Sequence, residues 1–311
     1  MPAYRRLHEE GKLRRRVEQA VALLEECRLC PRECRANRVA GERGRCRTGR
    51  RAIVSSYGPH FGEEAPLVGS GGSGTIFFAY CNLECCYCQN YTISQLGQGR
   101  EAESEELAQM MLSLERDGCH NVNLVSPTHV VPQMLEALEI ASERGLSVPL
   151  VYNSGGYDSV ATLELLDGIV DIYMPDMKYS DRETGQRFSG VEDYPAFNRA
   201  AVKEMHRQVG DLKLDDRGVA IKGLLVRHLV LPARLAGTDE TCRFLSREIS
   251  CNTYLNVMSQ YRPCYKASDV PELARSVTKE EFDEALRTAG AHGVHRLDGV
   301  ESRYFMRIPA D

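Results

Sequence analysis

The chain has 311 residues, a formal net charge of −5 and 12 cysteines. This length allows a sizeable core in one large or two small domains. No stretch approaches the ~20 apolar residues of a membrane span, and the Arg-rich, acid-containing start is not typical of a signal peptide. The composition therefore excludes a membrane-spanning or disulfide-stabilised secreted protein, and we expect metal and thiol chemistry in a reducing cytoplasm.

The charge is unevenly distributed along the chain. Residues 1–51 contain fourteen Arg, one Lys and seven Glu, so the acidic excess lies in the remainder. A basic segment can face nucleic acid, or it can dock on the acidic remainder and balance anionic thiolates. We favour docking, and we expect neither a nucleic-acid nor a membrane partner.

The first predicted element is an amphipathic helix over residues 10–26, followed by four closely spaced cysteines. Its apolar face consists of Leu13, Val17, Ala20, Val21 and Leu24. The C-x2-C-x3-C-x11-C pattern that follows, which we call the cysteine box, consists of Cys27, Cys30, Cys34 and Cys46. Four thiols suit a structural zinc ion or an auxiliary [4Fe-4S] cluster, and four free thiols are the alternative. A closed site of this kind supports folding or relays electrons, since it leaves no position for a substrate.

A second cysteine pattern follows the Gly-rich residues 69–74 and an apolar strand at 75–79. Cys81, Cys85 and Cys88 have C-x3-C-x2-C spacing, and Cys86 between them is interpreted as a bystander. Short spacings on a loop that leaves a strand let three thiolates converge on one metal centre. Three cysteines leave one iron of a [4Fe-4S] cluster open to a ligand. A zinc knuckle or reduced core cysteines are the alternatives.

From residue 75 onward, predicted strands alternate with predicted helices. Helices are expected from Ser104 to Gly118, up to Arg144, after Asp158 and from Pro195. The predicted strands are 75–79, 121–126, 148–153, 169–177, 223–231 and 254–260. Six successive βα units indicate a parallel sheet with right-handed crossovers and outer helices.

The expected fold is therefore α/β, a partial (β/α)6 TIM-like barrel with an N-terminal helical, Cys-rich extension. We expect the extension at residues 1–69, the barrel at 70–265, and a C-terminal helix and tail at 266–311.

Polar residues lie at or near the carboxyl ends of the predicted strands, where active sites form in such folds, and the strand at 223–231 holds two of them. They are Ser126, Thr128, His129, Asn153, Ser154, Asp176, Lys178, Arg227, His228 and Tyr261. Asp176 and Lys178 are two residues apart and share one face of their strand. Arg227 and His228 are adjacent, so only one can point inward, and strand geometry does not say which.

The three-cysteine motif, with the aromatic Tyr87 before its last cysteine, resembles the cluster motif of the radical S-adenosylmethionine (SAM) superfamily. The chain is similar to the pyruvate formate-lyase-activating-enzyme branch, and closest to its uncharacterised stand-alone relatives. The resemblance covers residues 70–265, and the cysteine box recurs in those relatives. It implies a [4Fe-4S] cluster, SAM, reductive cleavage of SAM to a 5′-deoxyadenosyl radical, and hydrogen abstraction from a substrate.

The resemblance also implies site residues. Asp176, Lys178 and His228 match contacts to SAM and to a bound monovalent cation, which favours His228 over Arg227 as the inward residue. Asn153 and Ser154 match contacts to the SAM ribose. Ser126-Pro127-Thr128-His129 stands where activating enzymes have Gly-Gly-Glu-Pro, which receives the SAM amino group, so we expect Ser126 and Thr128 near the cofactor.

Two departures from the activating enzymes make SAM cleavage better supported than glycine activation. One is the missing Gly-Gly-Glu-Pro stretch, and the other is the cysteine box, which precedes the barrel instead of following the motif. Three functions stay open: hydrogen abstraction from a protein or peptide, including a glycyl-radical partner; radical SAM modification of a small metabolite or RNA; and a non-catalytic metal protein. We expect anaerobic chemistry with a flavodoxin- or ferredoxin-like reductant. Candidate hydrogen donors or substrate contacts are Cys264, Tyr261 and His129, each with a structural role as the alternative.

Overall fold

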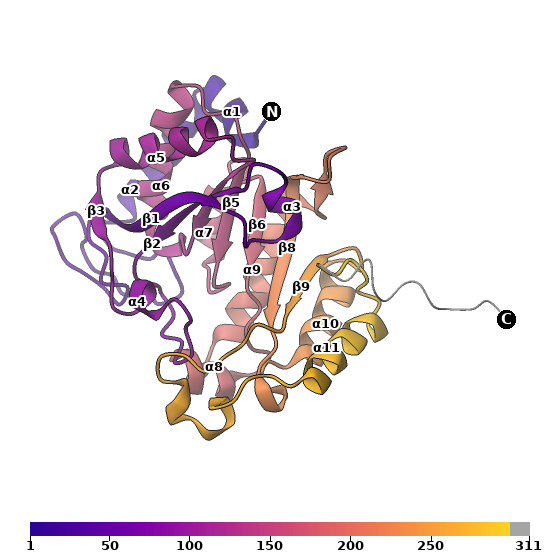
Figure 1. Cartoon of the computed structure of the whole chain (residues 1–311). Coiled ribbons are helices and arrows are strands. Elements are labelled where there is room, and N and C mark those ends of the chain that lie inside the picture. Colours follow the sequence, from indigo (N-terminus) through magenta and orange to yellow (C-terminus); the bar gives the residue numbers. More distant parts are fainter. Residues whose placement is uncertain (299–311) are drawn as a thin grey trace.

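The computed structural model describes residues 1–298, and a nine-stranded sheet forms the centre of that part of the chain (Figure 1). Six of its strands are parallel neighbours in the order β2-β4-β5-β6-β8-β9. They are Ser73–Phe78 (β2), Val122–Val125 (β4), Leu150–Ser154 (β5), Ile172–Pro175 (β6), Ala220–Leu229 (β8) and Tyr254–Met258 (β9). Each overlaps one predicted strand, so the prediction of six parallel strands is confirmed.

Three further strands run antiparallel to their neighbours and were not predicted. They are Ala52–His60 (β1), Arg100–Ala102 (β3) and Lys213–Leu214 (β7). β1 pairs with the free edge of β2, β3 pairs with β1, and β7 pairs with β8. The described part of β9 pairs with β8 but with no strand beyond it, so the barrel is partial, as expected.

Most of the helices lie in the connections between the parallel strands, but the first three precede β2 and the last follows β9. The helices are Ala3–Glu9 (α1), Lys12–Ala22 (α2), Ala65–Val68 (α3), Tyr91–Ser94 (α4), Ser104–Arg116 (α5), Val131–Glu143 (α6), Val160–Leu165 (α7), Arg182–Ser189 (α8), Tyr194–Val209 (α9), Thr238–Phe244 (α10) and Lys279–Ala291 (α11). Short helical turns lie at Thr128–Val130 (η1), Pro232–Arg234 (η2), Leu245–Ile249 (η3), Ala267–Asp269 (η4) and Pro271–Leu273 (η5).

The predicted helix at 10–26 is wrong in its boundaries. Gly11 adopts φ of +69°, which separates α1 from α2, and α2 ends at Ala22. The predicted apolar face is real, because Leu13, Val17 and Ala20 are buried.

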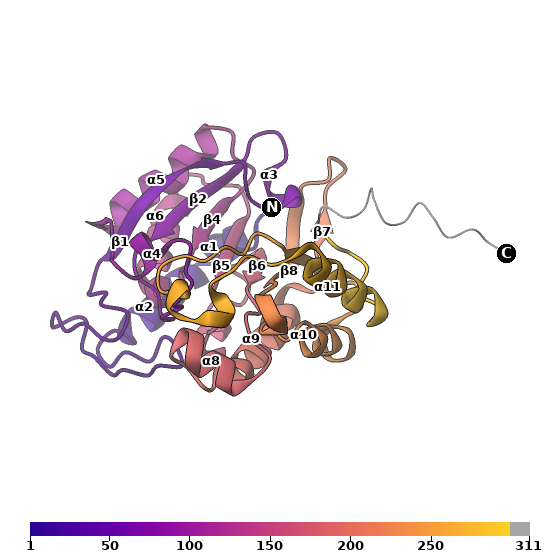
Figure 2. The same ribbon diagram turned by 60° about the horizontal axis from the view of Figure 1, so that its bottom comes forward.

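The N-terminal helices belong to the same core as the barrel. One cluster of buried side chains contains Leu13 of α2, Leu124 of β4, Met134 of α6 and Leu286 of α11. Figures 1 and 2 show α2, α5 and α6 near the end of the sheet formed by β1 and β2, and α10 and α11 near the end formed by β8 and β9. Helix α11 lies in the predicted C-terminal segment, of which residues 299–311 fall outside the described residues. None of the helices in residues 1–298 is long and apolar enough to cross a bilayer.

Candidate functional site

The three-cysteine loop (residues 80–90) leaves the carboxyl end of β2. Backbone hydrogen bonds hold it against α8: the Glu84 N–H donates to Ser189 O at 3.2 Å and the Cys86 N–H to Phe188 O at 2.8 Å. Tyr87 of the loop also packs into an aromatic cluster that includes Tyr179. The loop is therefore fixed to the barrel at one rim, as the position of its motif after a strand predicts.

Each thiol of the motif has a polar neighbour. The Leu83 N–H donates to Cys81 Sγ at 3.4 Å, the Ser189 hydroxyl donates to Cys85 Sγ at 3.0 Å, and Cys88 Sγ lies 3.0 Å from Ser94 Oγ. Hydrogen bonds to cysteine sulfurs stabilise thiolates and tune iron–sulfur clusters. The donor set therefore fits a cluster-binding loop.

Burial alone does not favour ionised thiols at this loop. Burial, together with Cys85 and Cys88 nearby, raises the pKa of Cys81 to about 12. Burial likewise raises the pKa of Cys88. A bound metal centre would reverse this, because its positive charge keeps coordinating thiols deprotonated. Cys86 does not line the cavity described next, in keeping with its interpretation as a bystander.

A cavity of about 220 Å³ opens above the carboxyl ends of the strands, and we call it the strand-end cavity. The residues that line it include Cys81, Cys85, Cys88, Asn90, Ser126, Asn153, Ser154, Asp176, Lys178, Arg227, Met258 and Gln260. All three thiols of the motif and the ends of five strands therefore meet at one place. This is the rim that the sequence predicted.

The charged side chains of this rim form a tight group. Asp176 accepts from Lys178 Nζ at 2.6 Å through Oδ2 and from Arg227 Nε at 2.9 Å through Oδ1. Burial acts to raise the pKa of Asp176, but the charges of Arg227 and Lys178 outweigh it and lower that pKa. Since both oxygens of Asp176 are already paired with cations, the structure gives no support to a monovalent cation bound there.

The expected orientation of Arg227 and His228 is wrong. Arg227 lines the strand-end cavity, whereas His228 is fully buried on the other side of β8. The His228 ring is held by Met177 O, 2.8 Å from Nδ1, and by Thr238 Oγ1, 2.9 Å from Nε2. Adjacent residues of a strand face opposite ways, and the ion pair with Asp176 draws Arg227 inward.

Asn153 and Ser154 both line the strand-end cavity. Asn153 Oδ1 accepts from Arg227 Nη2 at 2.7 Å, while its buried Nδ2 has no hydrogen-bond partner among the described residues. A buried amide N–H₂ without an acceptor is costly, so this group indicates a ligand in the cavity. Ser154 donates to Asp158 Oδ2 at 2.7 Å.

Thr128 requires a second correction. It does not line the strand-end cavity, and its hydroxyl donates to Asp158 Oδ1 at 2.6 Å. Asp158 also accepts a hydrogen bond from the Tyr152 hydroxyl. This buried carboxylate therefore links β5 to the residues that follow β4. Thr128 therefore supports the cavity wall without reaching into it, whereas Ser126 does line the cavity.

The three candidate hydrogen donors lie away from the strand-end cavity. Tyr261 is buried and donates to Leu273 O at 2.7 Å, and Cys264 is half-buried in the same segment. His129 lies with its Nε2 3.0 Å from Ala79 O, and burial with the nearby Arg38 charge lowers its pKa to about 4. The contacts of Tyr261 and His129 favour the structural alternative for these two residues.

The four thiols of the cysteine box line one small pocket together with Arg38, Asn82 and His129. Arg38 is completely buried; its guanidinium donates to Gly49 O, to His129 O at 2.8 Å and to Cys27 Sγ at 3.9 Å. A buried guanidinium is unfavourable unless an anion lies near it, and an ionised box thiol would be that anion. Within residues 1–298, no three His, Cys, Asp or Glu side chains are gathered closely enough to hold a single metal ion.

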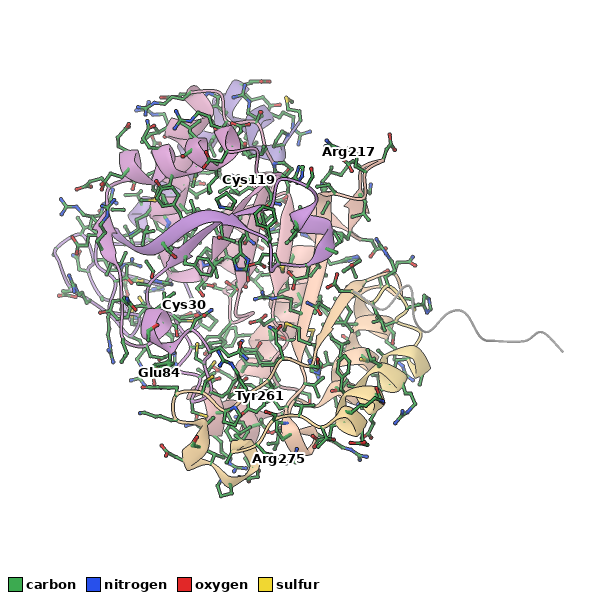
Figure 3. The ribbon with its side chains drawn as sticks, in the orientation of Figure 1. Cys30, Glu84, Cys119, Arg217, Tyr261 and Arg275 are labelled. Atoms are coloured by element: carbon green, nitrogen blue, oxygen red, sulfur yellow. The ribbon has the colours of Figure 1, made fainter. Side chains whose placement is uncertain are left out.

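The cysteine box docks on the three-cysteine loop. Arg32 Nε donates to Asn82 O at 3.0 Å, and Arg45 pairs with Glu84 at 2.8 Å. Figure 3 shows Cys30 and Glu84 on the same side of the molecule. The basic N-terminal segment thus docks on the rest of the chain, which is the arrangement we favoured from its charge.

Two acidic residues beside the strand-end cavity were not predicted from the sequence. Glu63 and Glu64 lie between β1 and α3 and line a second cavity that shares Arg227 with the first. No apolar pattern predicted the strand β1, so the sequence did not indicate that these two glutamates lie near the barrel.

Comparisons with known proteins find relatives that match most of this chain. Uncharacterized protein MJ0674 of Methanocaldococcus jannaschii is 35% identical over 284 residues, covering 88% of this chain and 77% of the relative. Uncharacterized protein MJ0808 of the same organism is 25% identical over 283 residues, covering 82% of this chain and 78% of the relative.

A crystal structure of a radical SAM methyltransferase from Sphaerobacter thermophilus matches with a TM-score of 0.49 and 13% identity, and the match spans 71% of this chain and 64% of that one. The model of the family described as "Radical SAM superfamily" matches residues 75–220, which contain the three-cysteine loop, most of β2 and strands β3 to β7. The chain belongs to the radical SAM superfamily.

Proposed function

We propose that this radical SAM enzyme holds a [4Fe-4S] cluster through Cys81, Cys85 and Cys88, binds SAM in the strand-end cavity, and abstracts hydrogen from a protein or peptide substrate. The observation that carries the proposal is that the three thiols and the polar strand ends line one cavity. The resemblance to activating enzymes supports the substrate class, with a glycyl-radical enzyme as one such partner. When bound, the cluster supplies the electron that cleaves SAM to a 5′-deoxyadenosyl radical.

The protein's own residues orient SAM and exclude water. Lys178 and Arg227 present positive charge to the SAM carboxylate, and the unpartnered Asn153 Nδ2 offers a hydrogen bond to a SAM oxygen. Leu83, Leu229 and other apolar side chains cover the walls of the same cavity. Because Asp176 pairs with both cations, it fixes their directions and does not itself need to touch SAM.

We also propose a flavodoxin- or ferredoxin-like protein as the electron donor and anaerobic conditions for the reaction. The first test is SAM cleavage: the anaerobically reconstituted, reduced protein should form 5′-deoxyadenosine from SAM. The substrate is identified by supplying unlabelled SAM together with deuterated candidate substrates. Deuterium appears in 5′-deoxyadenosine only when the candidate is the compound from which hydrogen is abstracted. A reconstituted protein that binds SAM but never yields 5′-deoxyadenosine would contradict the proposed function.

Lys178→Met should weaken SAM binding about tenfold, which corresponds to about 1.4 kcal/mol. The physical reason is loss of a buried positive charge from the cavity wall, and isothermal titration calorimetry measures it. Lys203→Met is the matched control, because Lys203 pairs with Glu248 on the surface and should leave SAM affinity unchanged. Equal affinities of the two variants would remove Lys178 from the proposed SAM site.

The cysteine box is proposed as a second, closed metal site with a mainly structural role. Its support is the shared pocket of four thiols and the buried Arg38 beside them. We favour a [4Fe-4S] cluster over zinc, because the protein already depends on cluster assembly. Its contacts with the three-cysteine loop would let it hold that loop in place.

Gly44→Ala tests the cysteine box. A Cβ at Gly44 would clash with Cys34 Sγ, so the substitution must displace that thiol. We expect metal analysis of the wild type to give about eight irons per chain, or about four irons and one zinc, and Gly44→Ala to lose the second site selectively. Gly49→Ala is the control, because the nearest atom to its new Cβ is 3.8 Å away. About four irons and no zinc in the wild type would show that the box holds no metal.

A further inference from the structure

A second cavity of about 480 Å³ adjoins the strand-end cavity. The two share Asn90, Arg227, Met258 and Gln260 as a common wall. The far wall of the second cavity, which we call the acidic cavity, includes His60, Glu63, Glu64 and Asn256. Its volume is in the range of small-molecule sites in proteins.

Glu64 has an unused acceptor at this cavity. The residue is only 5% exposed. Its Oε1 accepts from Asn256 Nδ2 at 2.9 Å, whereas its buried Oε2 has no hydrogen-bond partner among the described residues. A buried carboxylate oxygen left without a donor is unfavourable, so its presence in a cavity wall indicates that a donor arrives with a ligand.

Glu63 places a second acid beside the first. Its side chain is 9% exposed. Burial raises the pKa of Glu63 to about 7, with Arg227 acting against the rise and the negative charge of Glu64 adding to it. Arg227 directs Nε to Asp176 and Nη2 to Asn153, so its donors serve the strand-end cavity. His60 Nδ1 lies 3.6 Å from Glu63 Oε1, whereas no Lys, Arg or His among the described residues pairs with Glu64, so Glu64 keeps an open acceptor toward the cavity.

We infer that the acidic cavity binds the substrate of this enzyme through a protonated primary amine, held by the carboxylates of Glu63 and Glu64. The inference rests on the proposed function, since it takes the cavity beside the SAM site as the substrate site. An ammonium group has three N–H donors and no acceptor, which suits Glu64 Oε2 and a neighbouring carboxylate. The shared wall places the rest of an amine-bearing substrate toward the strand-end cavity, where hydrogen would be abstracted.

The test uses the full-length, cluster-reconstituted protein saturated with SAM. Ligand-observed NMR titrations compare n-butylammonium with 1-butanol, its neutral counterpart. We expect saturable binding of the ammonium and none of the alcohol. Glu64→Gln should weaken ammonium binding at least tenfold while SAM affinity is unchanged, because Gln keeps the Oε1 acceptor for Asn256 but removes the charge. Glu192→Gln, at an exposed ion pair with Arg182, is the control that should change neither.

Three results would overturn the inference: equal binding of alcohol and ammonium, ammonium binding that Glu64→Gln leaves unchanged, or loss of SAM affinity in Glu64→Gln. Displacement of the ammonium by millimolar Mg²⁺ at the same carboxylates would assign the pair to a metal ion instead. If Glu64→Gln does not fold, Glu63→Gln takes its place in each comparison. Formation of 5′-deoxyadenosine in the same samples separates the proposals: cleavage without ammonium binding contradicts only this inference, and binding without cleavage contradicts only the proposed function.

Discussion

Changing Cys81, Cys85 or Cys88 to Ala should abolish formation of 5′-deoxyadenosine from SAM. Each thiol lines the strand-end cavity, and a cluster held by two cysteines would lack the three-point attachment that leaves one iron open. Iron content should fall by about four per chain, and SAM affinity should fall with it. Iron analysis, absorption spectroscopy and product chromatography on anaerobically prepared variants measure these effects.

Cys86→Ala is the matched control within the same loop. Burial raises the pKa of Cys86 to about 11, and its backbone N–H, which the substitution keeps, donates to Phe188 O. We expect full iron content and unchanged SAM cleavage in this variant. Reductive cleavage that persisted after all three motif cysteines were changed to Ala would disprove the cluster assignment.

Asp176→Ala should have the largest effect on folding stability among the strand-end substitutions. It leaves Lys178 and Arg227 as neighbouring cations with little solvent around them, since their side chains are 18% and 19% exposed. Removing one partner from a buried ion pair costs about 3–5 kcal/mol. Urea unfolding followed by circular dichroism measures the free energy of unfolding, and SAM affinity should fall because the two cations lose their orientation.

The pH dependence of stability gives a second measure of Asp176. Because its pKa is lowered from the ordinary 3.8, its ion pairs contribute stability above that pH, and the contribution is lost as pH falls through the lower, folded-state pKa. The Asp176→Ala variant should therefore lose less stability than the wild type on acidification below pH 4. Glu192→Ala, at an exposed pair, should change the free energy of unfolding by no more than about 0.5 kcal/mol. A similarly small change in Asp176→Ala would show that the buried group contributes no net stability.

Much of the fold could be predicted because parallel strands are buried on both faces. Apolar runs such as Leu150–Ser154 and the apolar part of Ala220–Leu229 are typical of buried strands. The helices between them are predicted by the helical spacing of their apolar residues. β1 escaped because only its first three residues are buried and the rest alternates between half-buried and exposed. Its pairing with β2 is a tertiary contact that no local pattern encodes.

The site shows the same division between local and long-range information. The cysteine spacing and the Asp-x-Lys pair are local, and the structure brings them to one cavity. Arg227 points inward because it pairs with Asp176 on the neighbouring strand, and this contact between strands cannot be read from the sequence. The Glu63–Glu64 pair follows β1, and His129 lies beside the cysteine box with its Nε2 3.0 Å from Ala79 O.

The antiparallel strands at the start of the sheet have a consequence for aggregation. β2 is buried and apolar, and without β1 its row of free backbone N–H and C=O groups would be open to pairing with another chain. β1 covers that edge. The start of β1, Ala52–Val54, is covered in turn by the three-residue β3, whose Arg100 and Glu101 are exposed, and the rest of β1 forms the outer edge. Short, charged edge strands resist intermolecular pairing. A chain shortened to begin at residue 70 would therefore lose this protection along with the cysteine box, and sheet-to-sheet association would compete with its folding.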